Sequence, residues 1–177
     1  MKTLTAENPL GPLVSEMIAA MSAGYNYLCL LQSLAIPDIC GAIMNEDGRA
    51  TKSKYIEWYN EYIYKYFVML PADTCYSLRC GVIHQSKGDV KNNQIYNRIE
   101  FCRPGNYDIF TNRTILHGDV LTVNLEQFCI AMEHGVIDWY EKERSGPIFR
   151  KNAARVMRPR HILQDTDRAF YGPMVIG

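Results

Sequence analysis

Apolar residues recur every three or four positions along much of this chain, which is the spacing of amphipathic helices. The first such run begins after Gly11-Pro12 and continues to about Ser33. The segment Ile36-Pro37-Asp38 then predicts the start of a short second helix, which ends by Asn45. A turn over residues 46–49 closes this part of the chain.

A third helix is expected to begin near Thr51 or Ser53. Aromatic side chains recur along one face of it, at Tyr55, Trp58, Tyr59, Tyr62 and Tyr66. Such a stripe can serve as a stacking platform for nucleic-acid bases, but it is more typical of a packed core or of a surface between subunits.

A fourth helix is predicted over residues 71–88, because Pro71 and Asp73 stand near its start and Gly88 at its end. One face of this helix is apolar and carries Cys75, Leu78, Val82 and Ile83. We call this segment the motif helix, since it also contains the two residues that point most directly to chemistry, Arg79 and His84.

The spacing of the apolar residues changes after the motif helix. Polar and apolar residues alternate over 98–102, and residues 119–123 form a second β-like run, with Ile109-Phe110 as a fragment of a third. These runs predict a small antiparallel hairpin or sheet. A last long helix follows from Asn124, where Asn124 to Gln127 resembles a capping box, and it ends at Gly146-Pro147.

Length, composition and charge favour a single intracellular domain. The chain has 177 residues and 47% hydrophobic residues, enough for one substantial core. Its six cysteines lie mostly within apolar helical patterns, which predicts free thiols and a cytoplasmic location, and the sequence predicts neither a signal peptide nor a membrane span. The formal net charge is zero, but residues 145–177 hold six Lys and Arg against two Asp, so the tail is basic.

Arg79 and His84 suit phosphoryl chemistry that needs no metal. The guanidinium is a planar, permanently charged fork that matches phosphate oxygens, and imidazole exchanges protons near neutral pH. Five positions along a helix correspond to a net rotation of about 140°, so the two side chains do not lie directly above each other. A twofold dimer would bring two of each to one phosphate, and we therefore expect a homodimer with the motif helix at or beside the twofold axis.

The spacing of Arg79 and His84, within the phrase Cys75-Tyr-x-Leu-Arg-Cys-x-x-x-His-Gln85, resembles the HEPN superfamily. The resemblance covers about residues 10–90 and 124–145. It implies a mostly α-helical bundle of about five helices, with the small antiparallel hairpin inserted before the last long helix. It also implies Arg79 and His84 as the catalytic pair of a metal-independent endoribonuclease of a defence or toxin system, active as a dimer and without a cofactor.

In that layout, residues 1–177 form one domain: a helical part over 8–90, the hairpin over 95–123, the last helix over 124–145 and the basic tail over 146–177. RNA is the expected partner, and an antitoxin-like protein is a second candidate. The backbone of the RNA would be guided by Lys87 and by two arginines of the tail, Arg158 and Arg160.

Three alternatives remain open on the sequence. Arg79 can instead pair with a carboxylate such as Asp73 or Glu100 while His84 caps its own helix. Cys80 and His84 share a helix face, so they can form a thiol nucleophile pair, or half of a zinc site completed by Cys102 or His117. The third alternative is a HEPN-like module that binds a nucleotide, RNA or protein without catalysis, which the zero net charge and Cys80 favour.

Overall fold

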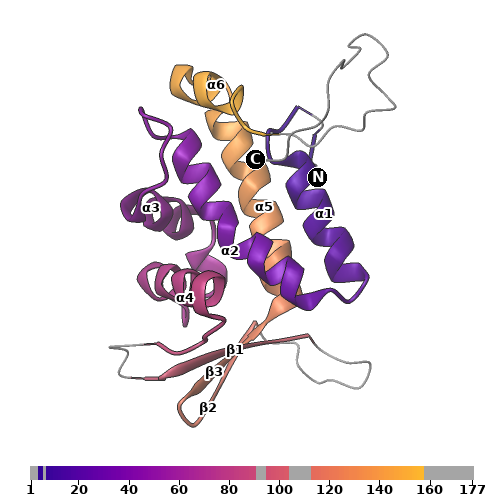
Figure 1. The fold of residues 1–177 in the computed structure, drawn as a ribbon, viewed down its shortest axis with the longest axis vertical. Coiled ribbons are helices and arrows are strands. Elements are labelled where there is room, and N and C mark those ends of the chain that lie inside the picture. The colour runs from indigo at the N-terminus through magenta and orange to yellow at the C-terminus, as the bar shows by residue number, and fades with distance from the viewer. Residues whose placement is uncertain (1–3, 6, 91–94, 104–112, 158–177) are drawn as a thin grey trace, which may run out of the picture.

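A computed structural model describes residues 4–5, 7–90, 95–103 and 113–157. In these ranges the chain is mostly helical, as the sequence predicts, with a small sheet at one end of the helices (Figure 1). The helices are α1 (Gly11–Ser22), α2 (Asn26–Ile43), α3 (Lys52–Tyr62), the 3-10 turn η1 (Tyr64–Tyr66), α4 (Ala72–Gln85), α5 (Leu125–Glu143) and α6 (Pro147–Ala153). The strands are β1 (Arg98–Cys102), β2 (Thr114–His117) and β3 (Val120–Asn124).

The long helix α5 lies in the middle of the bundle and packs against α1, α2 and α3 (Figure 1). It begins as predicted, because the side chain of Asn124 accepts a hydrogen bond from the backbone N–H of Gln127. Gly135 on α5 allows a close approach of α3, since a Cβ there would lie 2.9 Å from the Ile63 Cδ1 atom and 3.0 Å from Trp58.

The first apolar run divides differently from the prediction. It forms two helices, α1 and α2, separated at Gly24, which has a φ of +83°. That backbone conformation suits glycine, so the chain turns there although its apolar residues continue. The predicted helix start at Pro37 is also wrong, because Pro37 lies inside α2.

Helix α2 is long and apolar enough to cross a membrane by length and composition alone. It packs instead among five neighbouring helices, α1, α3, α4, α5 and α6. Nine of its residues are buried, and one of them, Asp38, is charged. The contacts are those of a helix in the centre of a bundle.

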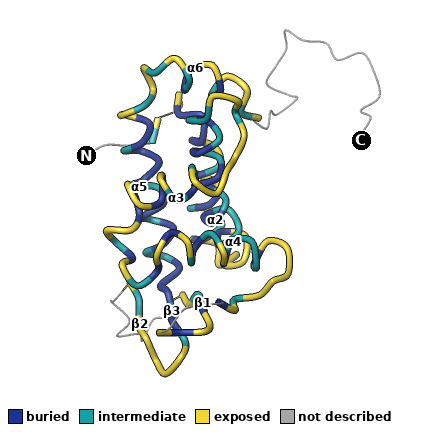
Figure 2. Tube along the Cα trace, turned by 90° about the vertical axis from the view of Figure 1, so that its left-hand side faces the viewer, coloured by how far each residue is buried: buried dark blue, intermediate teal, exposed yellow. Residues whose placement is uncertain are grey.

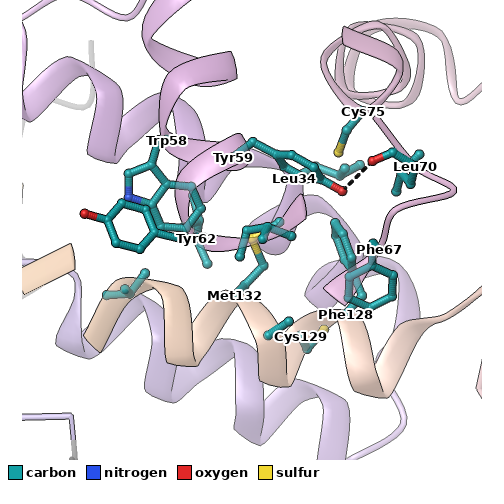
Figure 3. Close-up of a cluster of buried hydrophobic side chains, with 14 of the residues drawn as sticks. Leu34, Trp58, Tyr59, Tyr62, Phe67, Leu70, Cys75, Phe128, Cys129 and Met132 are labelled. Atoms are coloured by element: carbon teal, nitrogen blue, oxygen red, sulfur yellow. Dashed lines mark hydrogen bonds between the residues drawn. The ribbon is translucent and has the colours of Figure 1, made fainter. Parts of the chain in front are cut away.

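Helices α3 and α4 confirm two of the predicted elements. The side chain of Thr51 caps α3 by accepting from the Lys54 backbone N–H. Four of the five residues of the predicted aromatic stripe belong to the core, since Tyr55, Trp58, Tyr59 and Tyr62 are all at most 7% exposed, whereas Tyr66 lies in η1 and is only partly buried. Figure 3 shows Trp58, Tyr59 and Tyr62 beside core residues of α2 and α5, and the Tyr59 hydroxyl donates to the Leu70 carbonyl at 3.0 Å. These buried rings are therefore not available to stack on bases.

The sheet contains an antiparallel hairpin, but not between the two runs that the sequence paired. Strands β1 and β3 are parallel, with Ile99 opposite Leu121, and the hairpin joins β2 to β3 through Gly118, which has a φ of +59°. Alternation identifies a strand but not its partner, which is why the pairing was predicted wrongly. The predicted fragment at Ile109-Phe110 lies outside the described residues.

The interior is continuous from the helices to the sheet. Buried positions run along α5 and into β3 (Figure 2), and Leu121 and Val123 belong to the same hydrophobic cluster as Phe128. All six cysteines carry free thiols, and only Cys80 and Cys102 are not buried.

The segment after α5 forms one more helix, α6, that the sequence did not predict. Its buried Asn152 donates from Nδ2 to the carbonyl oxygens of Ile43 and Asn45, at 3.0 and 2.7 Å, and so ties α6 to the end of α2. Residues 158–177, which include Arg158 and Arg160, lie outside the described residues.

Candidate functional site

Helix α4 holds both motif residues. Its buried face consists of Ala72, Cys75, Leu78 and Val82, so the helix is fixed against the bundle with Arg79 partly exposed and His84 fully on the surface. The helix ends at Gln85, earlier than predicted, and Ser86 takes the left-handed conformation with a φ of 53°. Two carbonyl groups of the last turn are satisfied there, because the backbone N–H of Ser86 donates to the Val82 carbonyl and that of Lys87 donates to the Gly81 carbonyl.

Arg79 forms an ion pair with Asp38 of α2. The Arg79 Nε and Asp38 Oδ2 atoms lie 2.5 Å apart, and the side chains are 24% and 11% exposed. The alignment does not meet hydrogen-bond geometry, so the contact is primarily one between charges. On the other side of the guanidinium, NH1 lies 3.8 Å from the Cys80 sulfur.

The carboxylates that the sequence suggested as partners of Arg79 are engaged elsewhere. Asp73 pairs with Lys52 of α3 at 2.9 Å, and Glu100 pairs with Arg98 of β1 at 3.0 Å. The alternative of a paired Arg79 is thus supported, but with a carboxylate that sequence reasoning missed. The signal was present, because Asp38 is the only charged residue within α2 and a lone carboxylate in an apolar helix needs a cationic partner.

The pKa values of this pair reflect burial and mutual attraction. Burial raises the pKa of the Asp38 carboxyl, and the charge of Arg79 only partly counteracts this. For Arg79, burial alone would lower the pKa, but contacts with Cys80 and Asp38 outweigh it and the net direction is upward. Arg79 therefore remains a full cation, held in place by its neighbours.

His84 lies in the last turn of α4, where a cation is favoured by the helix dipole. Its side chain makes no hydrogen bond or ion pair with any residue in the described part of the chain. It is therefore accessible to water and to a ligand. Lys87, the third predicted site residue on this segment, is also exposed.

The side of α4 next to Arg79 carries further polar and aromatic groups. The Lys52 ammonium lies 5.7 Å from the centre of the Tyr76 ring, and Tyr76 packs edge-on against the buried Tyr55. Burial, followed by the proximity of Cys80, raises the pKa of the Tyr76 hydroxyl. Lys52, Arg79 and Tyr76 therefore lie around Cys80 at the junction of α3 and α4.

The zinc alternative is not supported by this arrangement. No three His, Cys, Asp or Glu side chains come together as a metal site among the described residues, which include Cys80, His84, Cys102 and His117. A thiol mechanism would need Cys80 to be oriented by His84, and the structure gives Cys80 a contact with Arg79 instead.

Three surface cavities lie away from the motif. One of about 210 Å³ lies between α2 and α6, one of about 370 Å³ lies beside α1, and one of about 160 Å³ is lined by α2, α3 and α5. None of the three is lined by Arg79 or His84.

Comparisons with known proteins found no match: no family model matches the chain, and neither does any curated protein or solved structure.

Proposed function

We propose that this chain is a HEPN-like, metal-independent endoribonuclease that acts in the cytoplasm as a homodimer. The observation that carries the proposal is the state of the two motif side chains on α4. His84 is exposed and unengaged within the described residues, while Arg79 is held at the surface by Asp38. Phosphodiester chemistry requires a proton carrier and a positioned cation, and α4 carries one of each.

Each group has a defined role in this reaction. One His84, in its neutral form, removes the proton from the ribose 2′-hydroxyl, whose oxygen then attacks the adjacent phosphorus. The P–O5′ bond breaks, and the leaving 5′-oxygen takes a proton from the protonated His84 of a second copy. The products are a 2′,3′-cyclic phosphate and a 5′-hydroxyl, so the reaction consumes no water and needs no metal.

Arg79 stabilises the negative charge that grows on the phosphate oxygens. Asp38 is a positioning residue, because its carboxylate faces Nε and leaves the NH2 end of the guanidinium to meet the phosphate. Fixing the cation before the substrate arrives reduces the entropy lost in the transition state. Lys87 then supplies a contact to the RNA backbone.

The test is incubation of the purified chain with labelled single-stranded RNA in EDTA. Cleavage that leaves cyclic-phosphate ends, is abolished in His84→Ala and persists in His134→Ala supports the proposal. His134 is a matched control, since it is an exposed histidine on α5. RNA that stays intact over several sequences, or cleavage that survives in His84→Ala, contradicts it.

The second candidate is a HEPN-like module that binds RNA, a nucleotide or a protein such as an antitoxin without catalysis. The observation in its favour is the Arg79–Asp38 ion pair, because a neutralised arginine attracts a phosphate less strongly. RNA that is bound with unchanged affinity by His84→Ala, and is never cut by the wild type, would support this candidate.

A further inference from the structure

Large apolar side chains are exposed on two segments next to the motif histidine. They are Tyr25 at 61%, Tyr27 at 51% and Leu28 at 55%, at the start of α2, and Ile83 at 39% on α4. We call these four residues the tyrosine surface. It differs from the aromatic stripe of α3, because its rings face solvent and not the core.

A hydrogen bond joins the two segments of this surface. The Tyr27 hydroxyl and the Ser86 Oγ atom lie 2.9 Å apart, and Ser86 is the residue that terminates α4, two positions after His84. The Tyr27 side chain is thereby held beside the end of the motif helix. An exposed ring that is fixed in this way loses little conformational entropy when a flat ligand packs on it.

Positive charge surrounds the tyrosine surface. Lys87 follows the end of α4, and the Arg103 NH1 atom approaches the turn before α2, where it is 3.9 Å from the position that a Cβ on Gly24 would occupy. Residues 22–31, 80–88 and 101–103 contain no Asp or Glu, and of the two carboxylates that border them, Asp89 and Glu100, Glu100 pairs with Arg98. Exposed aromatic rings among cations, in segments without carboxylates, match a ligand that carries both bases and phosphates.

We propose that the tyrosine surface binds bases of single-stranded RNA next to the phosphate that His84 attacks, with Tyr25 and Tyr27 as stacking residues. This inference rests on the proposed function and specifies its substrate as unpaired RNA. Bases inside a duplex are already stacked on one another, so their faces cannot reach the tyrosines, whereas bases of a single strand can. Lys87 and Arg103 contact the phosphates on either side.

A second copy of the chain is the competing occupant of this surface, and the size of the surface disfavours it. Four apolar side chains are few for a stable dimer interface, which buries on the order of 1,200 Å² or more in total.

The experiment uses the full chain with His84→Ala, in EDTA, so that RNA is bound but not cut. Fluorescence anisotropy measures the affinity for a labelled 12-nucleotide single strand and for the same sequence as a duplex. Adding Tyr25→Ala and Tyr27→Ala is expected to weaken single-strand binding about tenfold or more, since two stacking contacts are lost. Adding Tyr64→Ala, which removes a 40% exposed ring on η1, is expected to change the affinity less than about twofold.

Three results would overturn the inference. The first is a double tyrosine variant that binds the single strand as well as its parent. The second is a dimeric parent whose tyrosine variant becomes a monomer in size-exclusion chromatography with light scattering, because the surface would then lie between copies. The third, which needs no substitution at the tyrosines, is 4-thiouridine RNA that crosslinks only to peptides outside residues 20–31 and 80–88.

The outcome is separable from that of the proposed function. RNA bound through Tyr25 and Tyr27 but never cleaved by the wild type leaves this inference standing and refutes the nuclease. RNA that is cleaved by His84, but binds with the same affinity when Tyr25 and Tyr27 are replaced, refutes this inference and leaves the nuclease standing.

Discussion

The Arg79–Asp38 ion pair is expected to show energetic coupling in a double-mutant cycle with Arg79→Ala and Asp38→Ala. Two unit charges whose centres are about 4 Å apart attract by about 4 kcal/mol at an effective dielectric constant of 20. Desolvation of Asp38 outweighs the attraction by Arg79, but it is a cost of each group alone and cancels in the cycle, whereas each single variant leaves one partly buried charge unpaired. We therefore expect each single variant to lose about 2–3 kcal/mol of unfolding free energy, and the double variant to lose about 2 kcal/mol less than the sum.

Urea unfolding followed by circular dichroism measures all four corners of this cycle. The linear extrapolation is comparable between variants if the slope against urea is unchanged. A coupling below about 0.5 kcal/mol would show that Asp38 does not hold the guanidinium. Arg79 would have to be treated as a free surface cation, and the positioning role of Asp38 would be lost.

Three further predictions follow from the described contacts. Burial raises the folded pKa of Asp38 above its unfolded value. The stability that depends on protonation of this carboxyl is therefore present below about pH 4 and is lost as the pH rises through the folded pKa. Urea titrations should show that the unfolding free energy of the wild type, relative to that of Asp38→Asn, falls from pH 4 to pH 7. His84→Ala should change the unfolding free energy by less than about 0.5 kcal/mol, because the side chain is exposed, and a larger loss would indicate a structural role. Asn152→Ala should cost about 1–3 kcal/mol in thermal or urea unfolding, since it leaves the carbonyls of Ile43 and Asn45 without their donor; an unchanged midpoint would mean that α6 does not brace α2.

Elements with both an apolar period and a capping residue could be predicted from the sequence. Helix α3 begins after Thr51 and α5 after Asn124, and in both cases the side chain of the cap bonds the first turn as expected. The division between α1 and α2 could not, because the apolar period runs through Gly24 and the turn there depends on its backbone conformation. Helix α6 was missed since its seven residues are too few to show a period.

The candidate site, too, could be predicted from the sequence only in part. Local spacing identified Arg79 and His84 as neighbours on one helix, and the structure places both on α4. The partner of Arg79 could not be predicted, because the Asp38 contact depends on how α2 packs against α4. The tyrosine surface was missed for a related reason: Tyr25 and Tyr27 lie at the start of a helix whose position beside Ser86 is a tertiary contact.

The role of His84 is tested by single-turnover cleavage, in EDTA, of an RNA oligonucleotide and of DNA with the same sequence. If His84 activates a 2′-hydroxyl, the wild type cuts the RNA and leaves the DNA intact, and His84→Ala cuts neither while remaining folded. Equal cleavage of RNA and DNA, or RNA cleavage that requires an added metal ion, would contradict a reaction carried out by His84 and Arg79.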